Sequence, residues 1–200
     1  SHCVIDMPRV RKQRTTKSLK IRDLNEYLRE KGPKRLPFTD NAVSIAVFFR
    51  PDHIVSAIKR RIMKASYVVA NIAWLSNREL LDALRTRKGV SIIIQHDKAL
   101  LRKHRPDYLA LPPMDNQKVA VRTIRSNSRA LAHHKMAVFL DADRRVMGCL
   151  SGSFNWTQQS AHNIEHVCCF DDAASLGNRF LQEHMDTRKI SKPVRRIRKR

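Results

Sequence analysis

The sequence predicts a single α/β domain, in which a mixed β-sheet is flanked by helices on both faces. Two observations support this fold class. Apolar residues recur alternately with the period of a strand and the period of a helix over the middle of the chain. The 200 residues, 42% of them hydrophobic, suffice for the core of one domain of ordinary size. We therefore expect one catalytic domain over residues 41–187.

The predicted elements alternate along the chain. A strand at 41–49 precedes a helix at 52–65, where Ile54, Ile58 and Ile62 recur at helical spacing. Ser76 stands three residues before Glu79, a capping-box pattern that opens a helix at 77–87. The remaining strands are predicted at 66–75, 90–97, 117–124 and in two apolar runs within 131–167, and a last helix at 172–186. The basic, proline-punctuated residues 98–116 are expected to form a connection.

The charge balance indicates an anionic partner. Forty Lys and Arg residues against 18 Asp and Glu give a formal net charge of +22. Nucleic acid is the first expectation and an anionic membrane surface the second. Residues 1–40 are interpreted as a basic N-terminal appendage, and 188–200 as a disordered basic tail. The tail's eight basic residues are candidates for phosphate contact: Arg188, Lys189, Lys192, Arg195, Arg196, Arg198, Lys199 and Arg200.

The four cysteines, Cys3, Cys149, Cys168 and Cys169, include no CxxC pair. This spacing favours a reducing compartment and predicts neither a metal site nor a cofactor. No apolar run is long enough to span a membrane, so the chain is expected to be soluble as given. Membrane association is expected only through an anchor absent from this sequence, and the compartment stays open.

Two short motifs carry possible chemistry. His133 and Lys135 form an HxK pattern at the start of an apolar strand, and Gly152-Ser153-Phe154-Asn155 forms a GSxN pattern at the end of the next, with Glu165 downstream. Together these motifs resemble the phospholipase D superfamily. The resemblance is to its single-motif branch, which includes bacterial non-specific endonucleases and the mitochondrial cardiolipin hydrolase/Zucchini proteins. It covers residues 42–185 and implies the phospholipase D-like fold.

One position departs from the family pattern. The family places an Asp five positions after the motif lysine, where this chain has Leu140, and Asp141 follows one residue later. The family residue supports structure and does not attack phosphorus. We expect Asp141 to take this role through a β-bulge.

The residue types suit phosphodiester chemistry. Side chains alternate along a strand, so His133 and Lys135 share one face and His134 takes the other. His133 can attack phosphorus, Lys135 and Asn155 can hold the non-bridging oxygens, and Ser153 can donate a further hydrogen bond. Glu165 can orient an imidazole through its Nδ1 proton. His134 is expected to be a packed or surface residue.

Attack and protonation of the leaving oxygen need two groups on opposite sides of phosphorus. This chain has one complete motif; His96-Asp97-Lys98 also fits HxK, but no GSxN follows it. The resemblance therefore implies a homodimer in which His133 of both subunits face each other. One histidine becomes phosphohistidine, the other protonates the leaving group, and no metal is needed.

Three functions remain open. The first is a non-specific endonuclease that cleaves DNA or RNA, or both. The second is a phospholipase D-type hydrolase of an anionic lipid such as cardiolipin. The third is a catalytically silent nucleic-acid-binding module on the same fold. The charge favours the first and third, whereas the complete set of polar residues weakens the third; an amphipathic membrane helix, which would favour the second, is not evident.

Overall fold

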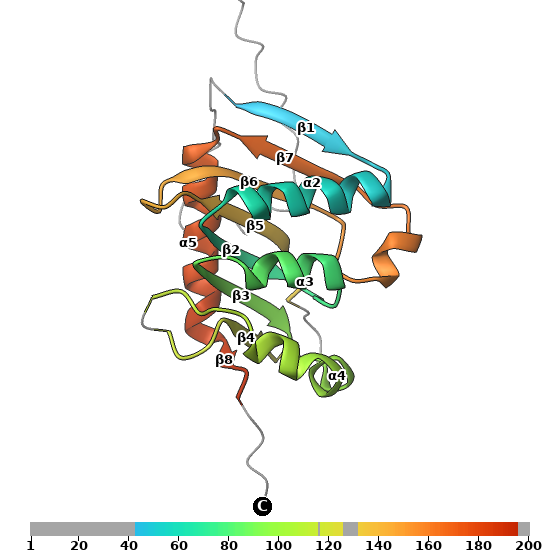
Figure 1. Cartoon of the computed structure of the whole chain (residues 1–200), viewed down its shortest axis with the longest axis vertical. Helices are drawn as coiled ribbons and strands as arrows, with labels where there is room; N and C mark the ends of the chain where they lie inside the picture. Colours follow the sequence, from blue (N-terminus) through green and yellow to red (C-terminus); the bar gives the residue numbers. More distant parts are fainter. Residues whose placement is uncertain (1–42, 116, 126–131, 196–200) are drawn as a thin grey trace, which may run out of the picture. The chain divides into compact units, whose positions relative to one another are not determined.

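The computed structural model describes residues 43–115, 117–125 and 132–195. This part of the chain forms an eight-stranded mixed sheet in the order β1-β7-β6-β5-β2-β3-β4-β8. Helices α2 and α3 cover one face of the sheet, and α5 packs on the other (Figure 1). The predicted fold class is confirmed. The expected appendage at residues 1–40 lies outside the described residues.

The bounds of the elements agree with most of the predicted ones. The strands are β1 (Ser44–Phe48), β2 (Tyr67–Ile72), β3 (Gly89–Gln95), β4 (Val121–Ile124), β5 (Lys135–Leu140), β6 (Val146–Gly152), β7 (Val167–Asp171) and β8 (Lys192–Pro193). The helices are α2 (Pro51–Lys64), α3 (Arg78–Arg85), α4 (Lys98–Leu109) and α5 (Ala174–Ile190), with a 3-10 turn at Gln159–His162. Strands β2, β3 and β4 are parallel, whereas β5 runs antiparallel to β2.

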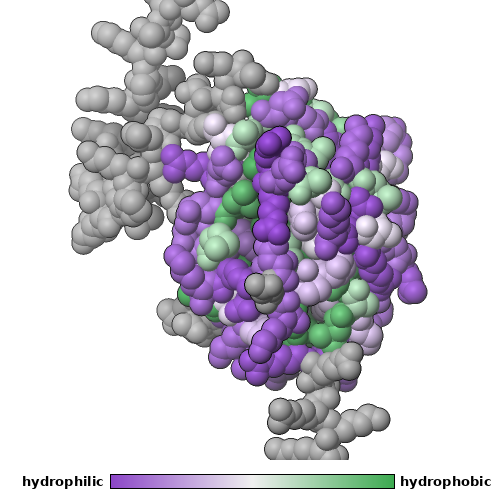
Figure 2. All heavy atoms as spheres, turned by 60° about the vertical axis from the view of Figure 1, so that its left-hand side comes forward, coloured by the Kyte–Doolittle hydropathy of each residue, from purple (hydrophilic) through white to green (hydrophobic). Residues whose placement is uncertain are grey.

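The main core lies between the sheet and α2 and α3. Ile54, Ile58 and Ile62, one turn apart on α2, are fully buried, because their helical spacing places all three on the face toward the sheet. Every residue of β3 is buried. The face of the molecule shown in Figure 2 is largely hydrophilic, with apolar residues scattered over it. The sheet is therefore covered on both faces around its centre, which holds β5, β2 and β3 rigidly.

Two local predictions were wrong. Residues 98–109 form helix α4, because Leu101 and Tyr108 are buried and the Asp97 side chain accepts a hydrogen bond from the backbone N–H of Leu100 at 2.9 Å. Helix α3 is capped by Asn77, whose side chain accepts from the N–H of Leu80 at 3.1 Å. The cap of this helix is therefore Asn77 and not Ser76.

The prediction of a disordered tail from residue 188 was also wrong. Helix α5 continues to Ile190, β8 pairs with β4, and Val194 is only 5% exposed. The Arg122 guanidinium on β4 donates to the Ser191 carbonyl at 2.7 Å and so fixes the turn between α5 and β8. Arg188 donates to Gln117 at 2.8 Å. These contacts outweigh the repulsion that the composition suggested; residues 196–200 lie outside the described residues.

The β5–β6 hairpin explains the displaced aspartate. The pairing of the two strands shifts register between Phe139 and Leu140, as a bulge does. The Asp141 carboxylate accepts hydrogen bonds at 2.8 Å from the backbone N–H groups of Asp143 and Arg145. Asp141 therefore supports the turn, in agreement with the structural role expected for it.

A buried polar cluster joins α5 to the sheet. His184 is 3% exposed, its Nδ1 lies 2.7 Å from Asn71 Oδ1, and its Nε2 lies 2.9 Å from Ser91 Oγ. Burial, and after it the charge of Arg188, lower the pKa of His184 from 6.5 to about 4. The imidazole is therefore neutral in the folded protein at neutral pH.

The His184 pKa predicts an acid-sensitive fold. Between pH 6.5 and about 4 the unfolded chain binds a proton at this site that the folded chain does not. The free energy of unfolding should therefore decrease by roughly 3 kcal/mol as the pH falls through this window. Chemical denaturation across this range checks it. His184→Gln should flatten the pH dependence and His162→Gln, on the surface, should not; equal slopes in all three proteins would contradict the prediction.

Candidate active site

The sheet topology brings the two predicted motifs together. The carboxyl ends of the parallel strands β2 and β3 lie at one edge of the sheet, and the antiparallel β5 begins there. Lys135 pairs with Ile72 at the end of β2, and Met136 pairs with Ser151 near the end of β6. The HxK residues and the residues after β6 therefore meet at this edge, which is where ligands bind in many open α/β sheets.

The segments around this edge are fastened to one another. The carbonyl of Trp156 accepts from the N–H groups of Ser76 and Asn77 at 2.7 and 2.8 Å, which ties the GSxN loop to the end of β2. The buried Gln95 side chain accepts from the N–H of Ala132 at 2.9 Å, immediately before His133. These hydrogen bonds join the GSxN loop to the end of β2, and the end of β3 to the segment before His133.

His133 and Lys135 are in direct contact. Lys135 Nζ lies 2.8 Å from His133 Nε2 and donates to the His133 carbonyl at 3.0 Å. Lys135 is only 7% exposed, whereas His133 is exposed. Burial, and then the charge of Lys135, lower the pKa of His133; burial also lowers the pKa of Lys135. These shifts favour the neutral form of His133, in which an imidazole nitrogen can act as a nucleophile.

Trp74 is a site residue that sequence reasoning missed. Its ring lies 5.4 Å from the His133 ring in a T-shaped arrangement, and Lys135 Nζ lies 5.9 Å from the Trp74 centroid. This geometry restrains the imidazole and places the cation over the indole face. The sequence signal that could have identified Trp74 is its position just after β2, which ends at the edge of the sheet where β5 begins.

The GSxN residues have different surroundings. Asn155 Oδ1 is buried and has no hydrogen-bond partner among the described residues. Ser153 Oγ accepts from the N–H of His166 at 3.0 Å and lies 3.4 Å from His166 Nδ1. Ser153 is therefore already engaged with a neighbour, His166, that was not singled out from the sequence.

Glu165 lies close enough to act on the pair electrostatically. Its charge raises the pKa of both His133 and Lys135, against the effect of burial. The hydrogen bond that the structure gives its carboxylate comes from Asn163, at 3.3 Å. Orientation of an imidazole by Glu165 remains a prediction.

His134 takes the opposite side of the strand, as alternation requires. Its Nε2 lies 3.5 Å from Glu183 Oε1 on α5. Lys189 pairs with Asp186 at 2.8 Å, and Lys192 and Arg195 are exposed. Contact of these and the other C-terminal basic residues with phosphate remains a prediction.

The described residues contain no group of three or more His, Cys, Asp or Glu side chains arranged to hold a metal ion. No helix in the described ranges is long and apolar enough to cross a membrane. Lys135 and Trp74 are in contact with His133.

Comparison with known proteins identifies the family of this chain. The family described as cardiolipin synthase, PLD-like domain, matches residues 52–186. The chain therefore belongs to the phospholipase D-like family. It is also 26% identical over 155 residues to the uncharacterized protein L381 of Acanthamoeba polyphaga mimivirus, an alignment that covers 58% of this chain and 54% of that protein. The chain thus spans about half the length of this curated relative.

Solved structures share the fold. The phospholipase D family member Nuc from Salmonella typhimurium matches with a TM-score of 0.59 at 18% identity, over 76% of this chain and 97% of that chain. NucT from Helicobacter pylori matches with a TM-score of 0.59 at 15% identity, over 76% and 99%. Phosphatidylserine synthase from Haemophilus influenzae matches with a TM-score of 0.55 at 14% identity, over 77% of this chain and 40% of that chain. At these identities the likeness shows the fold alone.

Proposed function

We propose that the protein is a metal-independent phosphodiesterase, a non-specific endonuclease that cleaves DNA, RNA or both through a phosphohistidine intermediate at a homodimeric site. The observation that carries the proposal is the contact of 2.8 Å between His133 Nε2 and Lys135 Nζ. A neutral imidazole beside a buried cation combines a nucleophile with a group that attracts a phosphate. Membership of the phospholipase D-like family supports this chemistry.

The reaction proceeds in two displacements at phosphorus. His133 Nε2 attacks, an N–P bond forms, and the bond from phosphorus to the leaving oxygen breaks. Protonated His133 of the second subunit gives its proton to that oxygen. The same histidine then accepts a proton from water as the water oxygen attacks phosphorus, and the N–P bond breaks. Lys135 and Asn155 hold the non-bridging oxygens throughout.

Nucleic acid is the favoured substrate because of the charge. A net charge of +22 draws a polyanion to the protein by counterion release, independently of base sequence. Contacts from Lys and Arg to the backbone position a strand without reading bases. Cleavage is therefore expected to show weak sequence preference.

A panel of end-labelled single-stranded DNA, duplex DNA, RNA and cardiolipin vesicles, each with and without EDTA, tests the proposal. Nucleic acid should be cleaved, and cleavage should persist in EDTA. His133 of one subunit supplies the nucleophile, and His133 of the other supplies the proton to the leaving oxygen. Activity that requires an added divalent metal would contradict the mechanism. Hydrolysis of cardiolipin alone would favour the lipid alternative, and binding without cleavage the silent module.

A further inference from the structure

A hollow of about 860 Å³ lies between α4 and the ends of β3 and β4. Basic side chains surround it: His96, Lys98, Arg102, Arg105 and Arg125. Apolar residues form the rest of its lining: Leu101, Pro106, Leu109 and Ala110. We call these two sets the basic rim and the apolar floor. The volume falls within the roughly 300–1,000 Å³ of ordinary ligand pockets.

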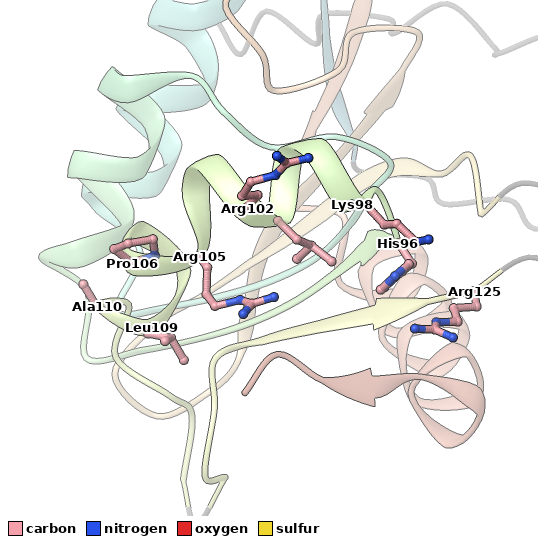
Figure 3. Close-up of a pocket in the computed structure, with 9 residues that line it drawn as sticks. His96, Lys98, Arg102, Arg105, Pro106, Leu109, Ala110 and Arg125 are labelled. Carbon is pink, nitrogen blue, oxygen red and sulfur yellow. The ribbon is translucent and has the colours of Figure 1, made fainter. Parts of the chain in front are cut away.

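The rim is rich in positively charged side chains. Figure 3 shows Arg105 extending from α4 toward β4, and Arg125 near His96 at the other end of the hollow. Arg105 Nε is buried without a hydrogen-bond partner among the described residues. Burial lowers the pKa of His96, and the charges of Arg125 and Lys98 lower it further; Asp97 opposes them. The Asp97 side chain also caps α4, so its carboxylate is already engaged.

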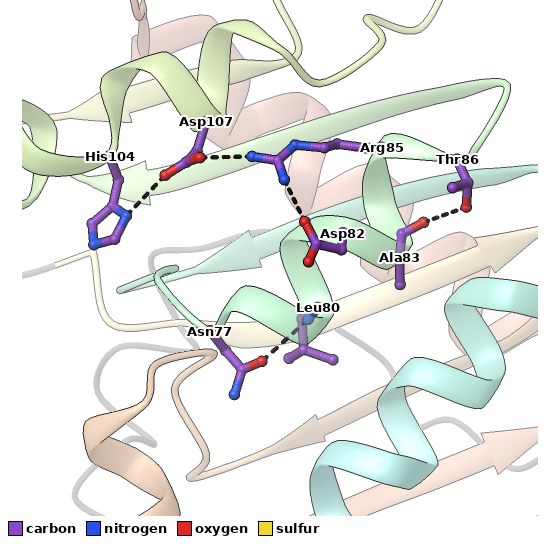
Figure 4. A network of polar contacts seen from close by, with 8 residues as sticks. All are labelled: Asn77, Leu80, Asp82, Ala83, Arg85, Thr86, His104 and Asp107. Carbon is purple, nitrogen blue, oxygen red and sulfur yellow. Dashed lines mark hydrogen bonds and ion pairs between the residues drawn. The ribbon is translucent and has the colours of Figure 1, made fainter.

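Helix α4 is held firmly in this position. Arg85 of α3 donates to Asp107 at 2.6 Å, and His104 Nδ1 lies 3.1 Å from the same carboxylate (Figure 4). The buried Tyr108 hydroxyl donates to the carbonyl of Leu75. The acidic group of α4 is thus used to fasten the helix, which leaves the rim cations facing the hollow.

The hollow also adjoins the candidate active site along the chain. Leu75 directly follows Trp74, whose ring contacts His133. Gln95, which bonds to the residue before His133, directly precedes His96. Both connections lie at the carboxyl edge of the parallel strands. The candidate active site and the hollow therefore lie at the same edge of the sheet.

We infer that the hollow binds one or more unpaired nucleotides of a single-stranded nucleic acid that flanks the cleaved bond. The inference rests on the proposed function. Phosphates neutralise the rim, and a base covers the apolar floor. A base can reach this floor only when it is unpaired, because in a duplex the bases are stacked inside and only their edges and the backbone face the protein. The hollow thus favours single strands over duplexes.

Binding is best measured on the full chain with His133→Ala, which leaves the labelled strand intact. The rim variant adds Arg102→Gln, Arg105→Gln and Arg125→Gln. Fluorescence anisotropy with a single-stranded oligonucleotide over a range of salt gives the slope of log affinity against log salt. Each lost phosphate contact should lower the magnitude of this slope by roughly 0.7, so the rim variant should lose about 2.

The matched control removes three cations elsewhere: Arg60→Gln, Lys64→Gln and Lys88→Gln, all exposed. Lys64 and Lys88 precede β2 and β3 and so lie at the opposite edge of the sheet. The control should keep the parent slope. An equal loss of slope in both variants would show that net charge alone acts, and would overturn the inference.

A second measurement needs no variant of the rim. An oligonucleotide with abasic positions keeps every phosphate but removes the bases, and should bind roughly 5-fold more weakly or worse if a base covers the floor. Equal affinity for both strands, or for a duplex of the same length, would overturn the inference. So would a rim variant that loses binding to cardiolipin vesicles but keeps its affinity for the oligonucleotide.

The two proposals fail separately in this design. If the wild-type protein cuts the strand but the rim variant keeps the parent's salt dependence of affinity, only the inference about the hollow is contradicted. A strand that binds with the full dependence on the rim but is not cut by the wild type would support the hollow and contradict the proposed endonuclease.

Discussion

His133→Ala should lower the rate of phosphodiester cleavage at least ~10³-fold, because it removes the nucleophile that forms the covalent intermediate. The imidazole is exposed, so its loss should leave the fold intact. The affinity for an uncut strand should change little, since Lys135 and the other cations remain. Single-turnover cleavage of a labelled oligonucleotide, with thermal unfolding as a check on folding, gives the comparison.

His134→Ala is the matched control for this variant. The neighbouring histidine lies on the other side of β5, near Glu183 of α5, and its removal should leave the cleavage rate near that of the wild type. A large loss in His134→Ala together with full activity in His133→Ala would mean that the reacting face of the strand has been assigned wrongly.

The central sheet could be predicted because its signals are local. The β-branched run before Gln95 and the apolar run after Lys135 each bury every residue of a strand, and both strands form where expected. Alternation alone placed His133 with Lys135 and His134 on the other side. The meeting of the two motifs followed from the resemblance, and the pairing of Lys135 with Ile72 and of Met136 with Ser151 supplies the physical reason.

What the sequence did not predict depends on contacts between distant residues. Trp74 and His133 are 59 positions apart by their numbers, and only the pairing of β2 with β5 brings their rings together. Helix α4 forms despite Pro106, because burial of Leu101 and Tyr108 compensates for the hydrogen bond that a proline cannot donate.

The C-terminal segment shows the limit of composition as a guide. Its basic residues predicted disorder, yet α5 continues to Ile190 because the hydrogen bond of Arg122 with Ser191 and the burial of Val194 anchor it. A count of charges cannot detect a few contacts of this kind. The basic rim of the hollow was missed for the same reason, since His96 and Arg125 meet only when β3 and β4 pair.

Wild-type activity should depend on a dimer, because one chain contains a single complete HxK motif and the reaction needs a nucleophile and an acid on opposite sides of phosphorus. Sedimentation should give a mass near twice 23.2 kDa. The exposure of His133 leaves it accessible to a second copy. When wild-type and His133→Ala chains exchange at an equal ratio, the activity per wild-type chain should fall to about half, because only dimers of two intact chains are active.

Mixing His133→Ala with Lys135→Ala chains provides the control for this experiment. Each combined dimer still lacks one histidine and one lysine, so little activity should return. Substantial rescue would show that one histidine and one lysine from different subunits are sufficient, and would contradict a site with two facing histidines. A stable monomer with full activity would contradict the dimer outright, and the proton donor would then have to lie within the chain, with His96 in the neighbouring hollow the first residue to replace.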